Sequence, residues 1–196
     1  MLAVLPRHPQ SPDLAWHGSW SPRRALEAAR IADLPVLQRL LLTTDGTVTT
    51  ALATLMGEPI GVRTLAQRSV VLSADDDELA LTAGERVLER SVLLHGAASG
   101  TPLLYGASRI ASDRLPRGAR DVLLSGGVAI GLVLRSYQLE TFRAPLSVGV
   151  RTASADASAH LGSGLMCWRR YAINAGGQAL MIVDEQFPAA GFGAAR

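Results

Sequence analysis

The chain has 196 residues and no lysine, so all 19 of its Lys or Arg positions are arginine. The absence of lysine excludes a lysine Schiff base, a pyridoxal-phosphate anchor and a P-loop lysine. Every cationic side chain other than histidine is therefore a planar guanidinium, which suits carboxylates and phosphates. A biased genomic base composition would give the same pattern, so the absence of lysine by itself assigns no function.

Cysteine and long apolar runs are scarce as well. Cys167 is the single cysteine, which excludes an internal disulfide and a cysteine-based zinc cluster. The four histidines lie far apart in the sequence and lack ligand spacing, so no metal site is predicted. No apolar run reaches the roughly 18 residues of a membrane span, and residues 1–10 do not resemble a signal peptide. These absences predict a cytoplasmic protein without a membrane partner.

The charge and composition favour one folded domain. The net charge is +2, and acidic residues stand between the basic ones, so no nucleic-acid-binding surface is predicted. Hydrophobic residues make up 48% of the chain, which is enough for a sizeable core. Residues 1–22 contain four prolines and predict an irregular N-terminal extension. Residues 23–196 are then expected to form a single domain.

The apolar pattern changes its period along the chain. Residues 25–42 and 47–55 have the spacing of helices, with a break near Pro35 and a stop at Gly57. A further helix is predicted over 117–124, and a mobile loop over 152–164. Strands are predicted over 60–72, 85–95, 102–110, 129–142, 166–174 and 178–187. Early helices followed by strands with hairpin-length connections predict an α+β fold with a single antiparallel sheet of about six strands.

Two charged residues fall on the apolar faces of predicted strands. Because side chains alternate across a strand, Arg90 shares a face with the aliphatic residues of 88–94, and Glu185 with those of 179–187. Burying either charge without a partner costs on the order of several kcal/mol. Three arrangements fit: a buried Arg90–Glu185 pair, a rim position that reaches water, or a pocket. In a pocket, Arg90 would bind an anionic ligand and Glu185 would meet a hydroxyl or a proton.

The strand that precedes the last hairpin carries weaker signals. Arg169 and Arg170 point to opposite faces of this strand, so one could face a pocket, but solvated arginines are the expectation. Met166 and Trp168 are expected in the core rather than against a ligand. These residues add no separate prediction of a site.

Several short segments, taken in order, resemble bacterial chorismate–pyruvate lyases of the 4-hydroxybenzoate synthase type. The resemblance covers about residues 36–188, and the order and spacing of its segments are fairly specific. The segments are Leu41–Thr49, Gly57–Ile60, Arg86–Arg90, Pro102–Tyr105, Asp113–Pro116, Ile130-Gly131, Glu140–Phe142, Arg169–Tyr171 and Gly176–Gln178, which leads to Glu185.

The resemblance implies a fold, a site and a reaction. The family fold is a single antiparallel sheet with helices packed around an enclosed ligand pocket. Arg90 matches an arginine that binds a substrate carboxylate, and Glu185 matches a glutamate that contacts the substrate hydroxyl. Val48, Ile130 and Gly131 match positions that line the pocket, and Leu132 is expected beside them. The implied reaction converts chorismate to 4-hydroxybenzoate and pyruvate, with a small-molecule substrate and neither a cofactor nor a metal.

The sequence also departs from the family, and these departures leave alternatives open. Some members carry an arginine on a flap at the position of Ala107. Arg109 lies two residues further on, and is therefore expected to substitute as the second carboxylate ligand. A diverged lyase or isomerase acting on another cyclic carboxylate is one alternative. A non-catalytic small-molecule-binding domain of the same fold is the other, and either a monomer or a homodimer fits.

Overall fold

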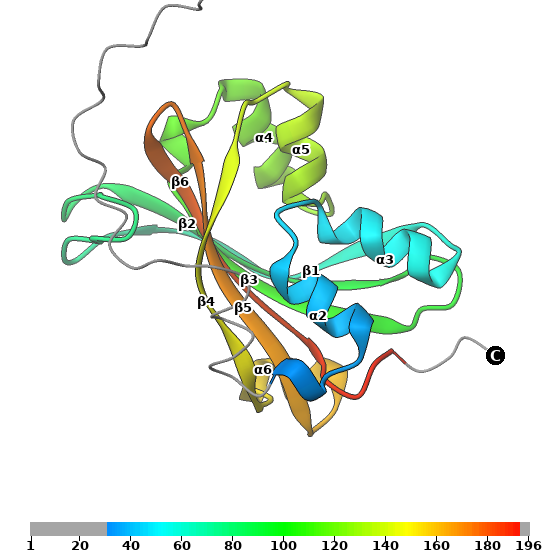
Figure 1. The fold of residues 1–196 in the computed structure, drawn as a ribbon. Helices are drawn as coiled ribbons and strands as arrows, with labels where there is room; N and C mark the ends of the chain where they lie inside the picture. The colour runs from blue at the N-terminus through cyan, green and yellow to red at the C-terminus, as the bar shows by residue number, and fades with distance from the viewer. Residues whose placement is uncertain (1–30, 193–196) are drawn as a thin grey trace, which may run out of the picture.

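The computed structural model describes residues 31–192, which form one six-stranded sheet flanked by short helices (Figure 1). The helices are η1 (Ile31–Asp33), α2 (Val36–Thr43), α3 (Val48–Met56), η2 (Ser112–Arg114), α4 (Arg117–Ser125), α5 (Ile130–Ser136) and α6 (Ala155–Leu161). The strands are β1 (Ile60–Val71), β2 (Arg86–Gly96), β3 (Pro102–Ile110), β4 (Phe142–Thr152), β5 (Leu165–Ala175) and β6 (Gln178–Pro188). The predicted extension over residues 1–22 lies outside the described residues.

The sheet is built from two antiparallel meanders that join in its middle. The strand order is β1-β2-β3-β6-β5-β4, and every neighbouring pair is antiparallel. The chain leaves β3, crosses through α4 and α5 to the far edge, and returns through β4 and β5 to β6 (Figure 1). The pairing of β3 with β6 therefore places residues from both meanders on one continuous sheet.

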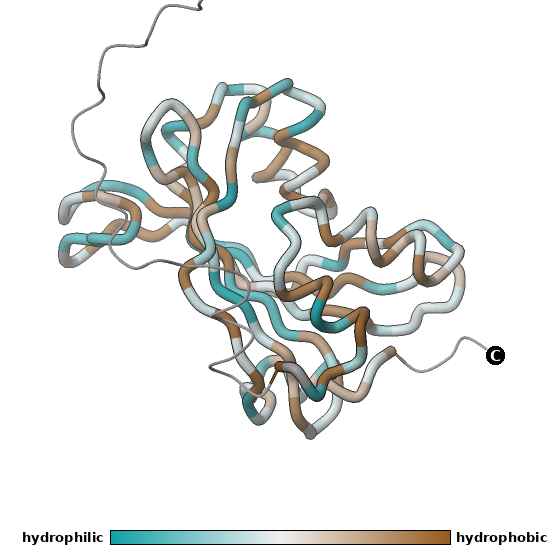
Figure 2. Tube along the Cα trace, viewed as in Figure 1, coloured by the Kyte–Doolittle hydropathy of each residue, from teal (hydrophilic) through white to brown (hydrophobic). Residues whose placement is uncertain are grey.

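Two pairs of helices cover the two ends of one face of the sheet and leave room for a site between them. Helices α2 and α3 pack over one end of this face through Leu41, Leu52 and Phe187, while α4 and α5 pack over the other end. Brown, hydrophobic stretches run along the strands and along α2 and α3 (Figure 2). The opposite face is covered by the segment 72–85, through Leu79 and Leu81, and by α6. Burial of these apolar faces is the main force that holds the layers together.

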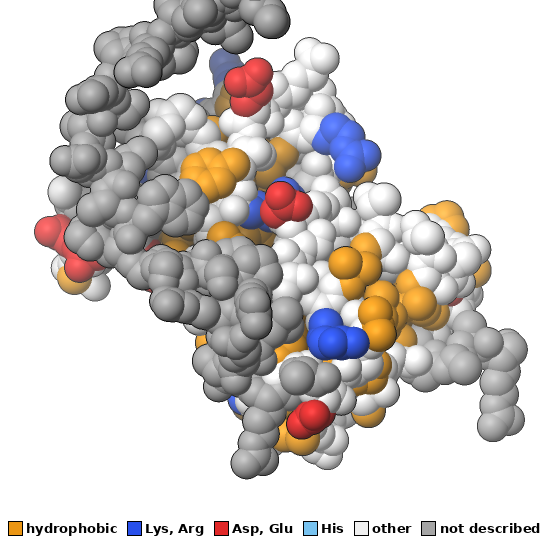
Figure 3. Space-filling model, in the orientation of Figure 1, with side chains coloured by type: hydrophobic (Ala, Val, Ile, Leu, Met, Phe, Trp, Pro, Cys, Tyr) orange, Lys and Arg blue, Asp and Glu red, His pale blue; other side chains and the backbone are white. Residues whose placement is uncertain are grey.

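The face drawn in Figure 3 carries scattered charges and an apolar area over two helices. Arginine side chains lie apart from one another on the face drawn in Figure 3, and hydrophobic side chains gather over α2 and α3. Val36 and Leu40, both of α2, are 71% and 57% exposed. Of the helices within residues 31–192, none is both long and apolar enough to cross a bilayer.

The structure confirms the predicted α+β fold and corrects two segments. The strand predicted over 129–142 is wrong, because this stretch forms α5 and the strand β4 starts only at Phe142. A short apolar run fits a buried strand and a buried helix equally well, whereas Pro145 weakens the signal of the true strand. The loop predicted over 152–164 is also wrong. It contains α6, whose first turn is capped by Ser154, with Oγ accepting a hydrogen bond from the amide of Ala157 at 3.2 Å.

Candidate active site

A cavity lies between the central strands and the first turns of α3 and α5. It collects five of the six residues predicted for the site, and the sixth, Arg109, lies elsewhere. We call it the central cavity, and its polar and helix-terminal lining includes Val48, Arg90, Ile130, Gly131, Arg143, Tyr171 and Glu185. Leu132, expected beside Ile130, does not line it, because its side chain points outward from α5 and is 54% exposed.

Arg90 places a positive charge in this cavity, with no counter-ion in the part of the chain that the structure describes. Its side chain, on β2, is only 4% exposed, and no carboxylate within residues 31–192 lies within salt-bridge distance. One Nη donates to the carbonyl of Val128 at 2.8 Å and contacts Thr64 Oγ1 at 3.5 Å, while Nε has no acceptor. Burial lowers the pKa of Arg90. A buried guanidinium with unused donors is suited to an anionic ligand.

Two helix starts face the same cavity as Arg90. Helix α3 begins at Val48 and α5 begins at Ile130, and neither has a side-chain cap. The first amides of a helix have no carbonyl partner within the helix, and they carry part of its positive dipole. These amides therefore add donors and positive potential to the same part of the cavity, as a carboxylate ligand requires.

Glu185 is held in the cavity by two neighbours on β5. Its Oε2 lies 2.5 Å from Nε of Arg169, and its Oε1 accepts a hydrogen bond from the hydroxyl of Tyr171 at 3.1 Å. Burial, followed by the nearby charge of Glu185, raises the pKa of Tyr171. A carboxylate oxygen accepts more than one hydrogen bond, so Glu185 keeps lone pairs for a ligand hydroxyl.

Arg169 is the residue that the sequence analysis missed. Its side chain is 4% exposed rather than solvated, and its Nη1 also donates to the carbonyls of Leu41 and Thr44 at 2.8 and 2.9 Å. Burial alone would lower the pKa of Arg169, but attraction to Glu185 leaves that pKa above its usual value. The predicted alternative of an Arg90–Glu185 pair is therefore wrong. The sequence contained a signal for the burial of Arg169. Because side chains alternate along a strand, Arg169 shares a face with Cys167, which is buried.

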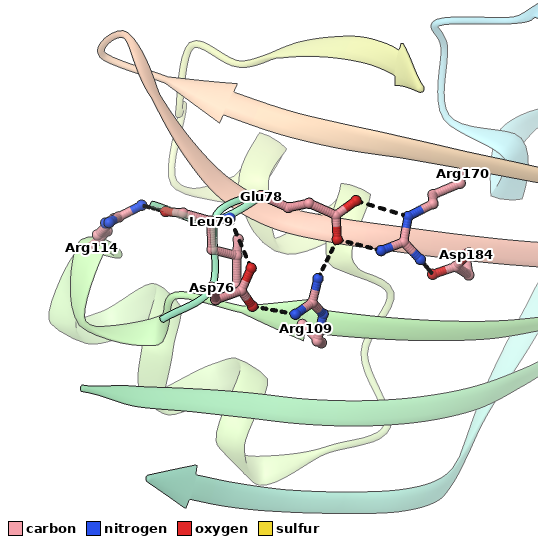
Figure 4. A network of polar contacts seen from close by, with 7 residues as sticks. All are labelled: Asp76, Glu78, Leu79, Arg109, Arg114, Arg170 and Asp184. Atoms are coloured by element: carbon pink, nitrogen blue, oxygen red, sulfur yellow. Dashed lines mark hydrogen bonds and ion pairs between the residues drawn. The ribbon is translucent and has the colours of Figure 1, made fainter. Parts of the chain in front are cut away.

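Arg109 lies on the opposite face of the sheet, in a network that anchors the segment 72–85 (Figure 4). Its guanidinium binds the carboxylates of Asp76 and Glu78, and Arg170 bridges Glu78 and Asp184 at 2.5 and 2.6 Å. Ser108 lines the central cavity, and side chains alternate along β3, so the side chain of the next residue, Arg109, points to the other face of the sheet. The structure thus gives Arg109 a structural position, and not the expected place beside the ligand.

The Glu78 network is expected to make stability depend on pH. Hydrogen bonding from Arg170, with the charges of Arg170 and Arg109, holds the pKa of Glu78 below its usual value. Ionised Glu78 therefore stabilises the fold above its unfolded pKa of about 4.3, and this contribution is lost as the pH falls through the lower folded pKa. We expect Glu78→Gln to lower the free energy of unfolding by about 1 kcal/mol at pH 7 and by almost nothing at pH 3.

Urea titrations at the two pH values measure this difference, with Glu140→Gln as the control, since Glu140 is an exposed glutamate outside the network. Equal losses for Glu78→Gln at pH 3 and pH 7 would contradict the assigned role. Turnover at the central cavity should be unchanged, because Glu78 lies across the sheet from it.

Within residues 31–192, no three His, Cys, Asp or Glu side chains are placed to share a metal ion. An α+β sheet with a cavity that holds two helix starts and an arginine without a carboxylate partner among residues 31–192 is suited to a small organic anion. The sequence model of the family described as chorismate pyruvate-lyase Rv2949c-like matches residues 42–192, so the chain belongs to this family of lyases. The resemblance found in the sequence is confirmed.

Curated relatives agree with this placement, and solved structures share the fold. The chain is 29% identical over 179 residues to the chorismate pyruvate-lyase of Mycobacterium leprae, covering 84% of this chain and 80% of that protein. It is 28% identical over 155 residues to the chorismate pyruvate-lyase of Mycobacterium tuberculosis, covering 76% and 78%. Its fold is similar to PhnF from Mycobacterium smegmatis, with a TM-score of 0.57, 17% identity and coverage of 86% and 85%. The effector domain of PhnF gives a TM-score of 0.55 at 17% identity, covering 72% and 88%.

Proposed function

We propose that this protein converts chorismate into 4-hydroxybenzoate and pyruvate. The observation that carries the proposal is the buried guanidinium of Arg90, which faces the central cavity without a counter-ion among residues 31–192. Chorismate is a dicarboxylate, so it brings the negative charge that this cavity lacks. Membership of the lyase family supports the same substrate. The proposal includes a cytoplasmic location and no nucleic-acid or membrane partner.

Both polar groups of the substrate ring have complementary residues in the proposed complex. The ring carboxylate binds the fork of Arg90 and the first amides of the helices that begin at Val48 and Ile130. The ring hydroxyl donates to Glu185, whose orientation is fixed by Arg169 and Tyr171. This arrangement orients the ring with respect to both ends of the cavity.

The reaction requires orientation and shelter from water. The bond between the ring and the ether oxygen breaks, the ring carbon that bears the hydroxyl loses its hydrogen, and the enolpyruvyl methylene gains one. The ring becomes aromatic, which drives the reaction forward. Binding both ends of the substrate holds the ether in a reactive conformer, and the apolar walls of the cavity, such as Val92 and Leu104, exclude water.

A single assay tests the proposal. Purified protein is mixed with chorismate, pyruvate is followed with a coupled dehydrogenase, and 4-hydroxybenzoate is measured by chromatography. We expect both products in equal amounts. Tight binding of chorismate without products would instead favour a non-catalytic binding domain, and the absence of binding would favour another cyclic carboxylate as substrate. Pyruvate formed with a different aromatic product would contradict the proposed product alone.

A further inference from the structure

We propose that Arg143, which reaches the central cavity from the edge strand β4, binds the second carboxylate of the substrate, the one on the enolpyruvyl side chain. The identification of that carboxylate rests on the proposed function. The observations behind the proposal are the place of Arg143 in the sheet, its unused donors and the balance of charge in the cavity. Arg143 takes the place that Arg109 was expected to fill.

Arg90 and Arg143 enter the cavity from opposite sides. Arg90 lies on β2 and Arg143 on the edge strand β4, with β3, β6 and β5 between them. Four strand spacings of roughly 4.8 Å separate the two backbones by about 19 Å, and both side chains line the same cavity. The two side chains therefore reach the cavity from strands that flank β6 and β5, which carry Glu185 and Tyr171.

One nitrogen of the Arg143 guanidinium is hydrogen-bonded to the backbone, and the others can donate to a ligand. Its Nη1 donates to the carbonyl of Asp45 at 2.9 Å, whereas its buried Nε has no acceptor within the described residues. No carboxylate of residues 31–192 lies within salt-bridge distance of it. Its Nη2 would lie 3.7 Å from a Cβ at Gly131, so the guanidinium sits close to the start of α5. A guanidinium held in this way can offer two parallel donors to a carboxylate.

The charges of the cavity match a dianion. Glu185 is neutralised by Arg169, so Arg90 and Arg143 are the two cations of the lining that lack a counter-ion among the described residues. A monocarboxylate would compensate one of them, and a dicarboxylate compensates both. Since 4-hydroxybenzoate retains only the ring carboxylate, Arg143 distinguishes the substrate from the aromatic product.

The test compares ligands with one and two carboxylates. Wild type, Arg143→Ala and Arg143→Lys are assayed for chorismate turnover and titrated by calorimetry with 4-hydroxybenzoate and with 3-(carboxymethoxy)benzoate, an unreactive aromatic dicarboxylate. We expect Arg143→Ala to raise KM for chorismate and Kd for the dicarboxylate about 10- to 100-fold, and to change Kd for 4-hydroxybenzoate less than about threefold. Arg143→Lys should recover part of the loss, because it keeps the charge without the fork.

Two controls separate binding from a structural role. Arg135→Ala removes an exposed arginine of α5 and should leave every constant unchanged, while Arg90→Ala should weaken both kinds of ligand. Equal weakening of both ligands by Arg143→Ala would overturn the proposal, and would instead assign Arg143 to anchoring the loop at Asp45. Unchanged constants would overturn it as well.

Failure of the proposed function gives a different result. If wild type forms no pyruvate from chorismate, the assignment of the reaction is wrong. The role of Arg143 is then decided by calorimetry alone, because a preference of wild type for the dicarboxylate that Arg143→Ala abolishes supports it. The same affinity ratio in both proteins rejects it.

Discussion

Replacing Arg90 with methionine is expected to reduce kcat/KM for chorismate about 100- to 1000-fold while leaving the fold at least as stable as before. The two effects have one cause. The guanidinium is buried with no counter-ion among the described residues, so it is unfavourable in the free protein and becomes favourable only when an anion enters. An apolar side chain of similar length removes this unfavourable charge, and we expect the free energy of unfolding to stay level or rise by about 1 kcal/mol.

Coupled assays and urea titrations measure these two quantities. Arg90→Lys should also be a poor enzyme, because an ammonium cannot present two parallel donors. Arg63→Met is the matched control, since Arg63 lies exposed on the neighbouring strand β1 and should affect neither quantity. A loss of several kcal/mol in Arg90→Met would mean that Arg90 is paired within the fold. Turnover equal to that of wild type would remove Arg90 from the site.

Glu185→Gln is expected to have the largest effect on stability, a loss of about 3–5 kcal/mol. The amide leaves Arg169 buried at 4% exposure without the negative charge that lies 2.5 Å from its Nε. Turnover should fall too, because Glu185 no longer offers a charged acceptor to the ring hydroxyl. The single variant therefore mixes a catalytic effect with a structural one.

The double variant Arg169→Met/Glu185→Gln separates these effects. Removing both charges relieves the uncompensated arginine, so we expect the double variant to recover at least half of the lost stability and none of the activity. Urea denaturation of wild type, Arg169→Met, Glu185→Gln and the double variant gives the coupling free energy between the two residues. Assays of the same samples give turnover. Additive stability losses would contradict a direct pair, and restored turnover would show that the carboxylate charge is not needed.

The sequence predicted Arg90 and Glu185 because strand alternation puts a charge on a face that must otherwise be apolar. The predicted last hairpin already placed the strand of Arg169 beside that of Glu185, and the structure confirms this pairing. Arg169 was not predicted as the partner because a solvated arginine was expected there. Whether Arg90 lies next to Glu185 depends on the order of the sheet, and the period of a single strand does not contain that order.

The error over residues 129–142 hid a second part of the site. Reading these residues as a strand concealed the start of α5 at Ile130, which only the family resemblance brought into the pocket. It also placed Arg143 just beyond a strand instead of within β4, so its side chain was never assigned to a face. By contrast, the strands predicted over 102–110 and 178–187 match β3 and β6 almost to the residue.

The joint between the two meanders has a consequence for how the protein becomes active. Arg90 belongs to the first meander, and Glu185 and Arg143 belong to the second, so neither half of the chain contains a complete site. The halves meet only when β3 pairs with β6, which closes a long loop through α4, α5, β4 and β5. Such non-local pairings form late and slowly, because loop closure must precede the contacts that reward it. The rate at which activity returns during refolding therefore reports the rate at which β3 pairs with β6.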